Sequence, residues 1–216
     1  MELNEAKRLI RQGESQRVEF KRKIKYPEKV IKELVAFANS DGGFLFIGVS
    51  DDGEIPGVKY PDDEIFALDQ AIGKHCRPEL PATVETIGLN EAASLVVYSI
   101  PSSDRKPHYV SVDGQKQVFV RDADKSIKAS KQVKEIIERR RKEKSITFNF
   151  GEKEKWLMDY LDKNKSITLK EFKTKNNLST YMASRGLILM VLANVLDVKP
   201  SDKEDVYTLK NHREKF

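Results

Sequence analysis

The sequence is poor in the features that build disulfides, zinc sites and membrane spans. Its 216 residues include one cysteine, Cys76, which excludes an internal disulfide and a cysteine-based zinc site. No apolar run approaches the roughly 20 residues that span a bilayer. The first residues are polar and amphipathic, unlike the apolar centre of a signal peptide. We therefore expect a cytoplasmic protein that has no membrane partner.

Phosphate-binding loop motifs are also missing. The sequence contains neither G-x-x-x-x-G-K-[ST] nor G-x-G-x-x-G. Gly42-Gly43 follow an expected helix and precede an expected strand, which reverses the order found in phosphate-binding loops. These glycines favour close backbone packing and a turn with positive φ. An ATP-binding regulatory role is accordingly the weakest of the functions considered.

The composition predicts a globular chain with room for one good core, or for a domain of about 150 residues and a smaller one. Hydrophobic residues make up 39% of the chain and charged residues 34%. The net charge of +5 is mildly basic. It permits an anionic partner without requiring one.

The most informative stretch is residues 35–57. The run from Phe44 to Val49 is apolar and lies between two turn signals, which predicts a strand buried on both faces. It follows a helix that Pro27 can start, and Asp51-Asp52-Gly53 come directly after it. Ligands of open α/β sheets bind at this end of a strand, so we expect function near Asp51.

Strands and helices alternate irregularly through the rest of a first domain, 1–145. Val18 and Phe20 alternate with polar residues, which predicts a strand with Glu19 and Lys21 on one face. Further helices are expected over 2–12, 61–75 and 128–144, and hairpins over 83–100 and 109–121. The last hairpin is expected to turn at Asp113-Gly114. The fold class expected is α+β with a mixed sheet.

A second, smaller domain is expected over 151–216. Three helical patterns precede two short apolar runs, which is the layout of a winged helix. Arg185 would lie on the second helix of the helix-turn-helix and could contact a DNA groove. The run from Leu187 to Leu192 is apolar all round, so burial in a homodimer is an equal alternative.

Three acidic residues, Glu14, Glu19 and Asp51, are candidate ligands for Mg²⁺ or Mn²⁺. Carboxylates that converge from different segments can hold such ions in nucleases. Spacing alone favours a structural interpretation, in which Glu19 pairs with a lysine and Asp51 belongs to a turn.

Two basic segments are candidate contacts for DNA or RNA. The run Arg105-Lys106-Pro107-His108-Tyr109 combines charge with an aromatic ring. Arg139, Arg140 and Arg141 belong to a strongly basic helix that could follow a nucleic-acid backbone. For both segments an exposed, solvated surface is the structural alternative.

Several motifs together resemble the Schlafen AlbA-type domain, also called the divergent AAA-type or DNA-binding domain. They are Glu14-Ser15-x-x-Val18-Glu19-Phe20-Lys21, the stretch from Val35 to Gly53, Arg105 to Tyr109, and Val118-Phe119-Val120-Arg121. The resemblance covers roughly residues 10–130. For bacterial members it implies an α+β fold and nucleic-acid binding, often with a C-terminal winged helix.

The same resemblance implies a second possible activity. Animal Schlafens are endoribonucleases that use three acidic residues, and by position these correspond to Glu14, Glu19 and Asp51. Lys21 would then steady the scissile phosphate. Ser50 stands where an acidic residue is common, so Asp51 is a better match than Asp52. Animal Schlafens clamp RNA between two such lobes, and a homodimer could supply the second.

The leading hypothesis is therefore a nucleic-acid-binding protein, specifically a DNA-binding transcriptional regulator. A metal-dependent endoribonuclease is the alternative. The residues expected to contact nucleic acid are Arg105, Lys106, His108, Tyr109, Arg121, Arg139, Arg140, Arg141 and Arg185.

Overall fold

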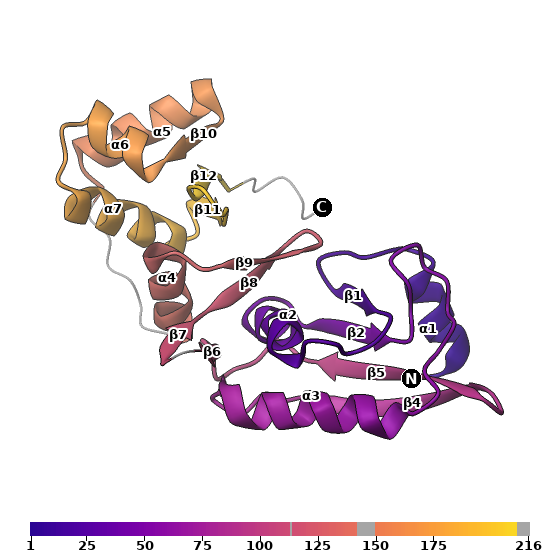
Figure 1. The fold of residues 1–216 in the computed structure, drawn as a ribbon. Coiled ribbons are helices and arrows are strands. Elements are labelled where there is room, and N and C mark those ends of the chain that lie inside the picture. Colours follow the sequence, from indigo (N-terminus) through magenta and orange to yellow (C-terminus); the bar gives the residue numbers. More distant parts are fainter. Residues whose placement is uncertain (113, 142–149, 211–216) are drawn as a thin grey trace. The chain divides into compact units, whose positions relative to one another are not determined.

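The computed structural model describes residues 1–112, 114–141 and 150–210 (Figure 1). The chain divides into two compact units, Met1–Lys128 and Ala129–Phe216. The domain boundary expected between residues 145 and 151 falls almost wholly outside the described residues. The basic helix placed before that boundary groups with the second unit.

The first unit is built on a mixed four-stranded sheet of order β1-β2-β5-β4. Its strands are β1 (Val18–Lys21), β2 (Gly43–Ile47), β4 (Thr83–Asn90) and β5 (Ala93–Ile100). β1 runs parallel to β2, and the other pairs are antiparallel. The expected α+β class with a mixed sheet is confirmed.

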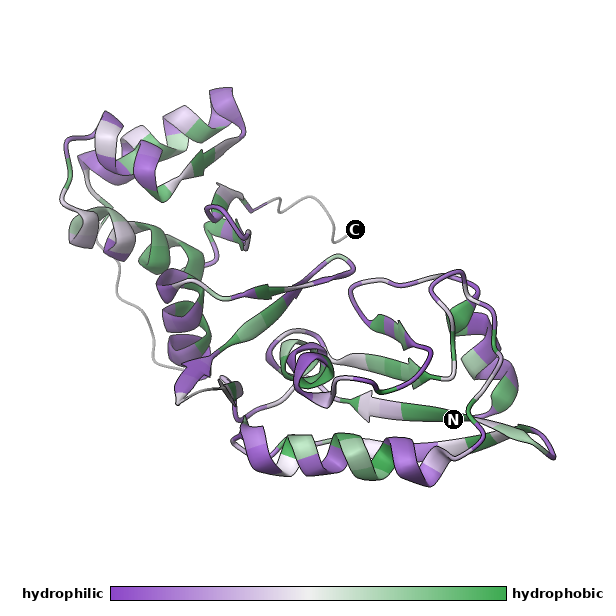
Figure 2. Cartoon of the chain, in the orientation of Figure 1, coloured by the Kyte–Doolittle hydropathy of each residue, from purple (hydrophilic) through white to green (hydrophobic). Residues whose placement is uncertain are grey.

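Helices cover both faces of this sheet, because successive strand residues point to opposite sides. Leu45 and Ile47 of β2 pack against α2 (Pro27–Asn39) and α3 (Pro61–His75). Phe46 points the other way, toward α1 (Leu3–Ile10). Figure 2 shows the apolar residues concentrated along β2 and β5. The prediction that this central strand is buried on both faces is confirmed.

Two smaller β-structures complete the first unit. β3 (Cys76–Arg77), β6 (Tyr109–Val112) and β7 (Gln115–Gln117) form one sheet, and β8 (Phe119–Asp122) pairs with β9 (Lys125–Lys128). The expected hairpin over 109–121 is therefore wrong in its second strand. Ala123, with φ of 53°, turns the chain after β8, so that β9 becomes its partner. Asp113 lies outside the described residues.

The second unit contains four helices and three short strands among its described residues. They are α4 (Lys131–Arg141), α5 (Glu152–Asn164), β10 (Ser166–Thr168), α6 (Leu169–Lys175), α7 (Thr180–Leu192), β11 (Leu196–Lys199) and β12 (Val206–Leu209). The strand order is β10-β12-β11. The apolar half of α7 is buried within this unit, where Leu187 and Val191 pack with Ile136 of α4. A dimer is not needed to cover it.

The helices of the described ranges are too short or too polar to cross a membrane.

Candidate nucleic-acid interface

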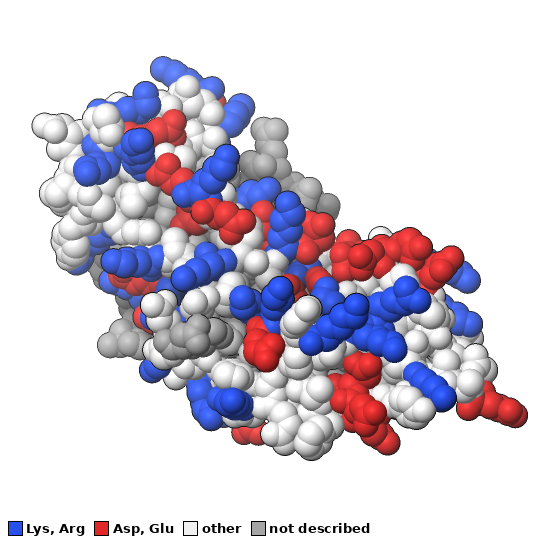
Figure 3. Space-filling view, in the orientation of Figure 1, with Lys and Arg blue, Asp and Glu red and all other residues white. Residues whose placement is uncertain are grey.

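A basic surface lies on the segment that connects β1 to α2 and on the first turn of α2. Arg22, Lys23, Lys25 and Lys29 are exposed in the segment that leaves β1 and begins α2. Figure 3 shows Lys and Arg side chains gathered over α2 and the end of β1, beside a group of Asp and Glu. Such a concentration of positive charge on one face attracts a phosphate backbone.

Tyr26 places an aromatic ring within this basic surface. Its side chain is 61% exposed, and the ammonium of Lys29 lies 4.9 Å from the ring centroid. Tyr26 is the residue before α2, and Pro27 occupies the first turn of the helix, where its fixed φ suits the backbone. The surface therefore offers both charges for phosphates and a face on which a base can stack.

Sequence reasoning missed this surface. Five basic residues and one acidic residue occupy positions 21–29, and they were interpreted only as the end of a strand and the start of a helix. A count of charge over that window, together with the aromatic residue within it, is the signal that could have found it.

Glu19 lies at the inner edge of this surface and is already engaged. It is buried, its carboxylate lies 3.1 Å from the Arg121 guanidinium, and it forms an ion pair with Lys21. The shared ion pair confirms that Glu19 and Lys21 project from one face of β1. The positive charges of Lys21 and Arg121 therefore hold the buried Glu19 carboxylate in place.

Glu14 has a structural contact of a different kind. Its Oε1 accepts a hydrogen bond of 2.9 Å from the backbone N–H of Phe20 in β1. Partial burial raises the pKa of Glu14, and the nearby charges of Glu19 and Asp51 raise it further, against the lowering by the Phe20 hydrogen bond and Lys21. Glu14 is thus within electrostatic reach of the two acids that are predicted to act with it.

Arg121 is a buried anchor, and the prediction that it contacts nucleic acid is wrong. Its side chain is fully shielded from solvent, beneath the surface that a phosphate could reach. Nη1 also lies 2.8 Å from Glu33 of α2, and Nη2 donates to the Ser15 carbonyl at 2.7 Å. The guanidinium stacks over Phe37 at 4.7 Å from the ring centroid. Arg121 therefore ties β8 to β1 and α2.

His108 is also buried, which overturns its predicted surface role. Its Nδ1 lies 3.0 Å from the Pro78 carbonyl and its Nε2 2.6 Å from Ser103 Oγ. Burial lowers the pKa of His108, and the positive charges of Arg105 and Lys106 lower it as well, which favours the neutral ring. A neutral, enclosed imidazole does not bind phosphate.

The other residues of that motif reach the surface to different degrees. Arg105 is exposed, and Tyr109 is half-buried with the Lys116 ammonium 4.8 Å from its ring centroid. Lys106 donates to the Ser40 carbonyl at 2.7 Å and to Ser102 Oγ at 2.8 Å. Its charge therefore helps to hold the turn after α2.

The predicted contacts of the second unit are exposed. Arg139, Arg140 and Arg141 form the last turn of α4, where Arg139 lies 2.5 Å from Glu135 one turn earlier. Arg185 of α7 donates to the Tyr181 hydroxyl at 2.9 Å. These side chains are available to a partner. The cations of the basic surface in the first unit are exposed as well, and they also surround the aromatic ring of Tyr26.

Comparison with known proteins identifies the family. The family model described as Schlafen, AlbA_2 matches residues 14–130, which is more than half of the chain. The chain belongs to the Schlafen, AlbA_2 family. The Schlafen, AlbA_2 match begins at Glu14 and ends between β9 and α4, so it coincides with most of the first unit. None of the curated proteins matches this chain.

Two solved structures are similar to about half of the chain. The N-terminal domain of a RecG-related protein from Nitrosomonas europaea is 24% identical, with a TM-score of 0.43, over 53% of this chain and 84% of that one. The DIP2311 protein from Corynebacterium diphtheriae is 18% identical, with a TM-score of 0.41, over 54% of this chain and 22% of that one.

The acidic residues of the Schlafen, AlbA_2 domain do not fit a metal site. Among the described residues, no three His, Cys, Asp or Glu side chains are arranged so that they could hold one ion. Glu19 is turned toward Arg121, and Glu14 toward the Phe20 amide. Two of the three expected Mg²⁺ or Mn²⁺ ligands, Glu14 and Glu19, therefore serve to hold β1, and the third, Asp51, is exposed in the turn after β2.

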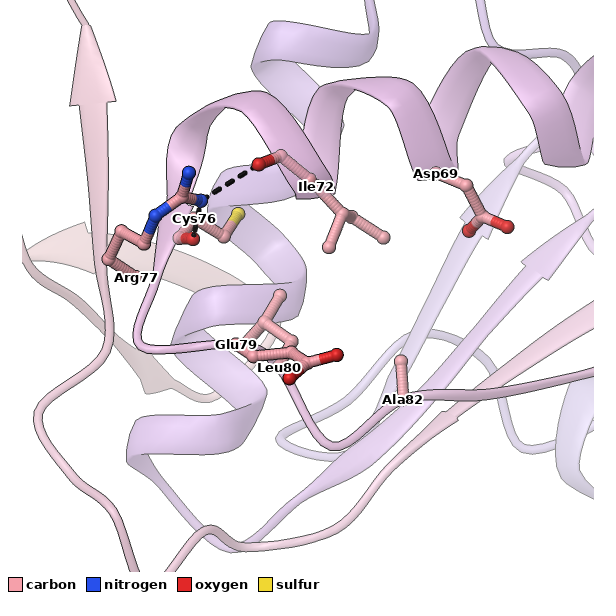
Figure 4. A pocket seen from close by; sticks show the side chains of 8 residues that line it. Asp69, Ile72, Cys76, Arg77, Glu79, Leu80 and Ala82 are labelled. Atoms are coloured by element: carbon pink, nitrogen blue, oxygen red, sulfur yellow. Dashed lines mark hydrogen bonds between the residues drawn. The ribbon is translucent and has the colours of Figure 1, made fainter.

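A hollow of about 450 Å³ lies beside the C-terminal end of α3 in the same domain (Figure 4). Its polar lining consists of Asp69, Glu79 and Arg77, whose Nη1 donates to the Gly73 and Cys76 carbonyls. Burial raises the pKa of the Cys76 thiol to about 12, so it is not a nucleophile at neutral pH. The acidic lining does not favour a phosphate.

Proposed function

We propose that this Schlafen, AlbA_2 protein binds nucleic acid through the basic surface formed by Arg22, Lys23, Lys25, Tyr26 and Lys29. The observation that carries the proposal is the exposed aromatic ring of Tyr26 within a group of exposed cations. Membership of a family associated with nucleic-acid binding supports the same general activity.

The charges of this surface are available to phosphates. The ion pairs found among the described residues leave out Arg22, Lys23 and Lys25. Lys21, by contrast, forms an ion pair with the buried Glu19 and positions the end of β1. Cations that meet phosphates release counterions from the nucleic acid, which makes the affinity depend on salt.

DNA is the nucleic acid that the second unit favours. Its order of helix, strand, two helices and hairpin corresponds to a winged helix, in which the second helix of the helix-turn-helix enters the major groove. Ser179 caps α7 by accepting from the Met182 N–H at 3.2 Å, and Tyr181 and Arg185 are exposed in the first two turns. We propose that these side chains read DNA and that the protein regulates transcription.

Cleavage draws less support from the same geometry. Glu14 is within electrostatic reach of Glu19 and Asp51, and Glu19 forms an ion pair with Lys21 at the end of β1. However, Glu19 is held by Arg121 and Lys21, and the acids do not form a metal site among the described residues. Binding without cleavage is therefore the function proposed.

A salt titration tests the proposal. A triple variant with Arg22→Gln, Lys23→Gln and Lys25→Gln should bind duplex DNA more weakly than the wild type. The slope of log K against log salt should fall by about 2.7, which is about 0.9 for each phosphate contact. Fluorescence anisotropy over a series of salt concentrations measures both quantities.

The matched control changes the same number of charges on α1 and directly after it, with Lys7→Gln, Arg8→Gln and Arg11→Gln. It should leave the slope nearly unchanged, because α1 covers the opposite face of the sheet from α2. The proposal is contradicted if the Arg22, Lys23 and Lys25 variant keeps the wild-type slope, or if the slope of the control falls by as much as the slope of that variant. The same assay with the triple variant Arg139→Gln, Arg140→Gln and Arg141→Gln measures how much α4 contributes to DNA binding.

A further inference from the structure

The outer edge of β4 is a long, exposed strand edge. In the sheet formed by the described residues, β4 pairs with β5 on one side and has no strand on the other. Six of its eight residues are exposed and the other two are partly exposed. A strand edge of this kind presents unpaired N–H and C=O groups that can pair with another strand.

The opposite edge of the same sheet is protected. β1 has four residues, and its Phe20 N–H, directed away from β2, donates to the Glu14 carboxylate. A short strand blocked by a side chain of the same chain resists pairing. Comparable protection of β4 by a side chain is not found in the described residues, and the strand contains neither proline nor lysine.

Apolar side chains accompany the open edge on its α3 side. Val84 is directly opposite Tyr98 of β5, whose hydroxyl donates to Asp69 of α3, so Val84 lies on the face that α3 covers. Val84 is 38% exposed, and Phe66 on α3 is 67% exposed. A strand added to β4 would cover Val84 and bring apolar surface toward Phe66.

The charges beside this edge are complementary to those of a second copy. β4 begins beside the C-terminal half of α3, since Ala82 lines the same hollow as Ile72 and Gly73. The first turn of α3 carries Asp62 and Asp63, and its last turn carries Lys74. In an antiparallel pairing of two β4 strands the two α3 helices are also antiparallel, so the acidic end of each faces the basic end of the other.

We propose that the β4 edge is a homodimer interface, in which two copies join their sheets through antiparallel β4 strands. The register that centres on Thr86 places the two threonines opposite each other and each Glu85 opposite Ile87 of the other copy. It avoids a pair of like charges, and the Glu85 carboxylate is already paired with the N-terminal ammonium of its own chain. Each copy in the dimer keeps its own basic surface, which adjoins β1 at the edge of the sheet opposite to β4.

Sedimentation equilibrium of the full chain over a range of concentrations tests this interface. The wild type should dimerise, and Thr86→Lys should raise the dimer dissociation constant by about tenfold or more, because two lysines then face each other across the axis. Phe66→Ser should weaken the dimer in the same direction. Gln12→Lys, an exposed change of equal charge in the same unit, should leave the dissociation constant unchanged.

Hydrogen exchange of the wild type should show protection of residues 83–88 that increases with protein concentration. A chain that stays monomeric at every concentration overturns the proposal and leaves the edge for a strand of another protein. A dimer that Thr86→Lys does not weaken, or that Gln12→Lys weakens equally, also overturns it. Circular dichroism verifies that each variant is folded, and the DNA titration reports nucleic-acid binding separately.

Discussion

Arg121→Ala is expected to lower the free energy of unfolding of the first unit by about 3–5 kcal/mol. The substitution leaves the buried carboxylate of Glu19 and the partly buried carboxylate of Glu33 without the guanidinium that lies 3.1 Å and 2.8 Å from them. An uncompensated buried charge is among the most destabilising changes a single substitution can make. Urea denaturation followed by circular dichroism measures the difference.

The pH dependence of this defect has a definite sign. Burial raises the pKa of Glu33, and the charge of Glu19 raises it further, while Ser126, Arg121 and Lys21 lower it. Without Arg121 the Glu33 carboxyl group holds its proton more tightly in the folded state than in the unfolded state. Stability is then lost as pH rises above the ordinary carboxyl pKa, so the defect should be largest near neutral pH and shrink in acid.

Two controls separate the buried network from a general effect of removing arginine. Arg139→Ala removes an arginine whose pair with Glu135 is exposed, and it should change stability by less than about 1 kcal/mol. Adding Glu19→Gln to Arg121→Met should cost less than the sum of the two single changes, because the charge left unpaired is removed. Strict additivity, or equal losses for Arg121→Ala and Arg139→Ala, would contradict the buried network.

Asn39→Ala is expected to destabilise the first unit by about 3 kcal/mol. The Asn39 side chain is buried at the end of α2 and makes three hydrogen bonds. Nδ2 donates to the carbonyls of His108 and Phe119, each at 2.9 Å, and Oδ1 accepts from the His108 N–H at 2.7 Å. Alanine leaves those backbone groups buried without partners.

The matched control for this substitution is Asn164→Ala. Asn164 also donates to a backbone carbonyl, that of Tyr160 at 2.9 Å, but its side chain is exposed, so water can replace the bond. It should change the free energy of unfolding by less than about 1 kcal/mol. A loss for Asn39→Ala as small as that of the control would show that Asn39 does not join α2 to β8 and to the residue before β6.

The sequence predicted most of the first unit because its periodic patterns are strong. Alternation around Phe20 and the apolar run from Phe44 gave β1 and β2, and Pro27 and Pro61 marked where α2 and α3 begin. The partner of β8 was not predictable from pattern. It depends on the turn at Ala123 and on the long-range bond between Asn39 and Phe119, neither of which leaves a periodic signal.

The site was predicted less completely, because burial of polar residues cannot be seen in a motif. Arg121 and His108 belong to the family motif, and the structure shows that they hold the fold together. Gly43 has a similar role, since a Cβ there would lie 2.4 Å from Phe37 and 2.7 Å from the Arg17 carbonyl. The positive charge of residues 21–29 is visible in the sequence, but the pattern was interpreted only as the end of a strand and the start of a helix.

The most direct test of nucleic-acid binding through the basic surface is photocrosslinking of the full chain to duplex DNA, with the attached peptides identified by mass spectrometry. The expected result is crosslinking at Tyr26 in the segment 22–29, lost when unlabelled DNA competes and weakened in the Arg22, Lys23 and Lys25 variant. Crosslinks confined to α4 and α7, with none in residues 22–29, would contradict the proposal.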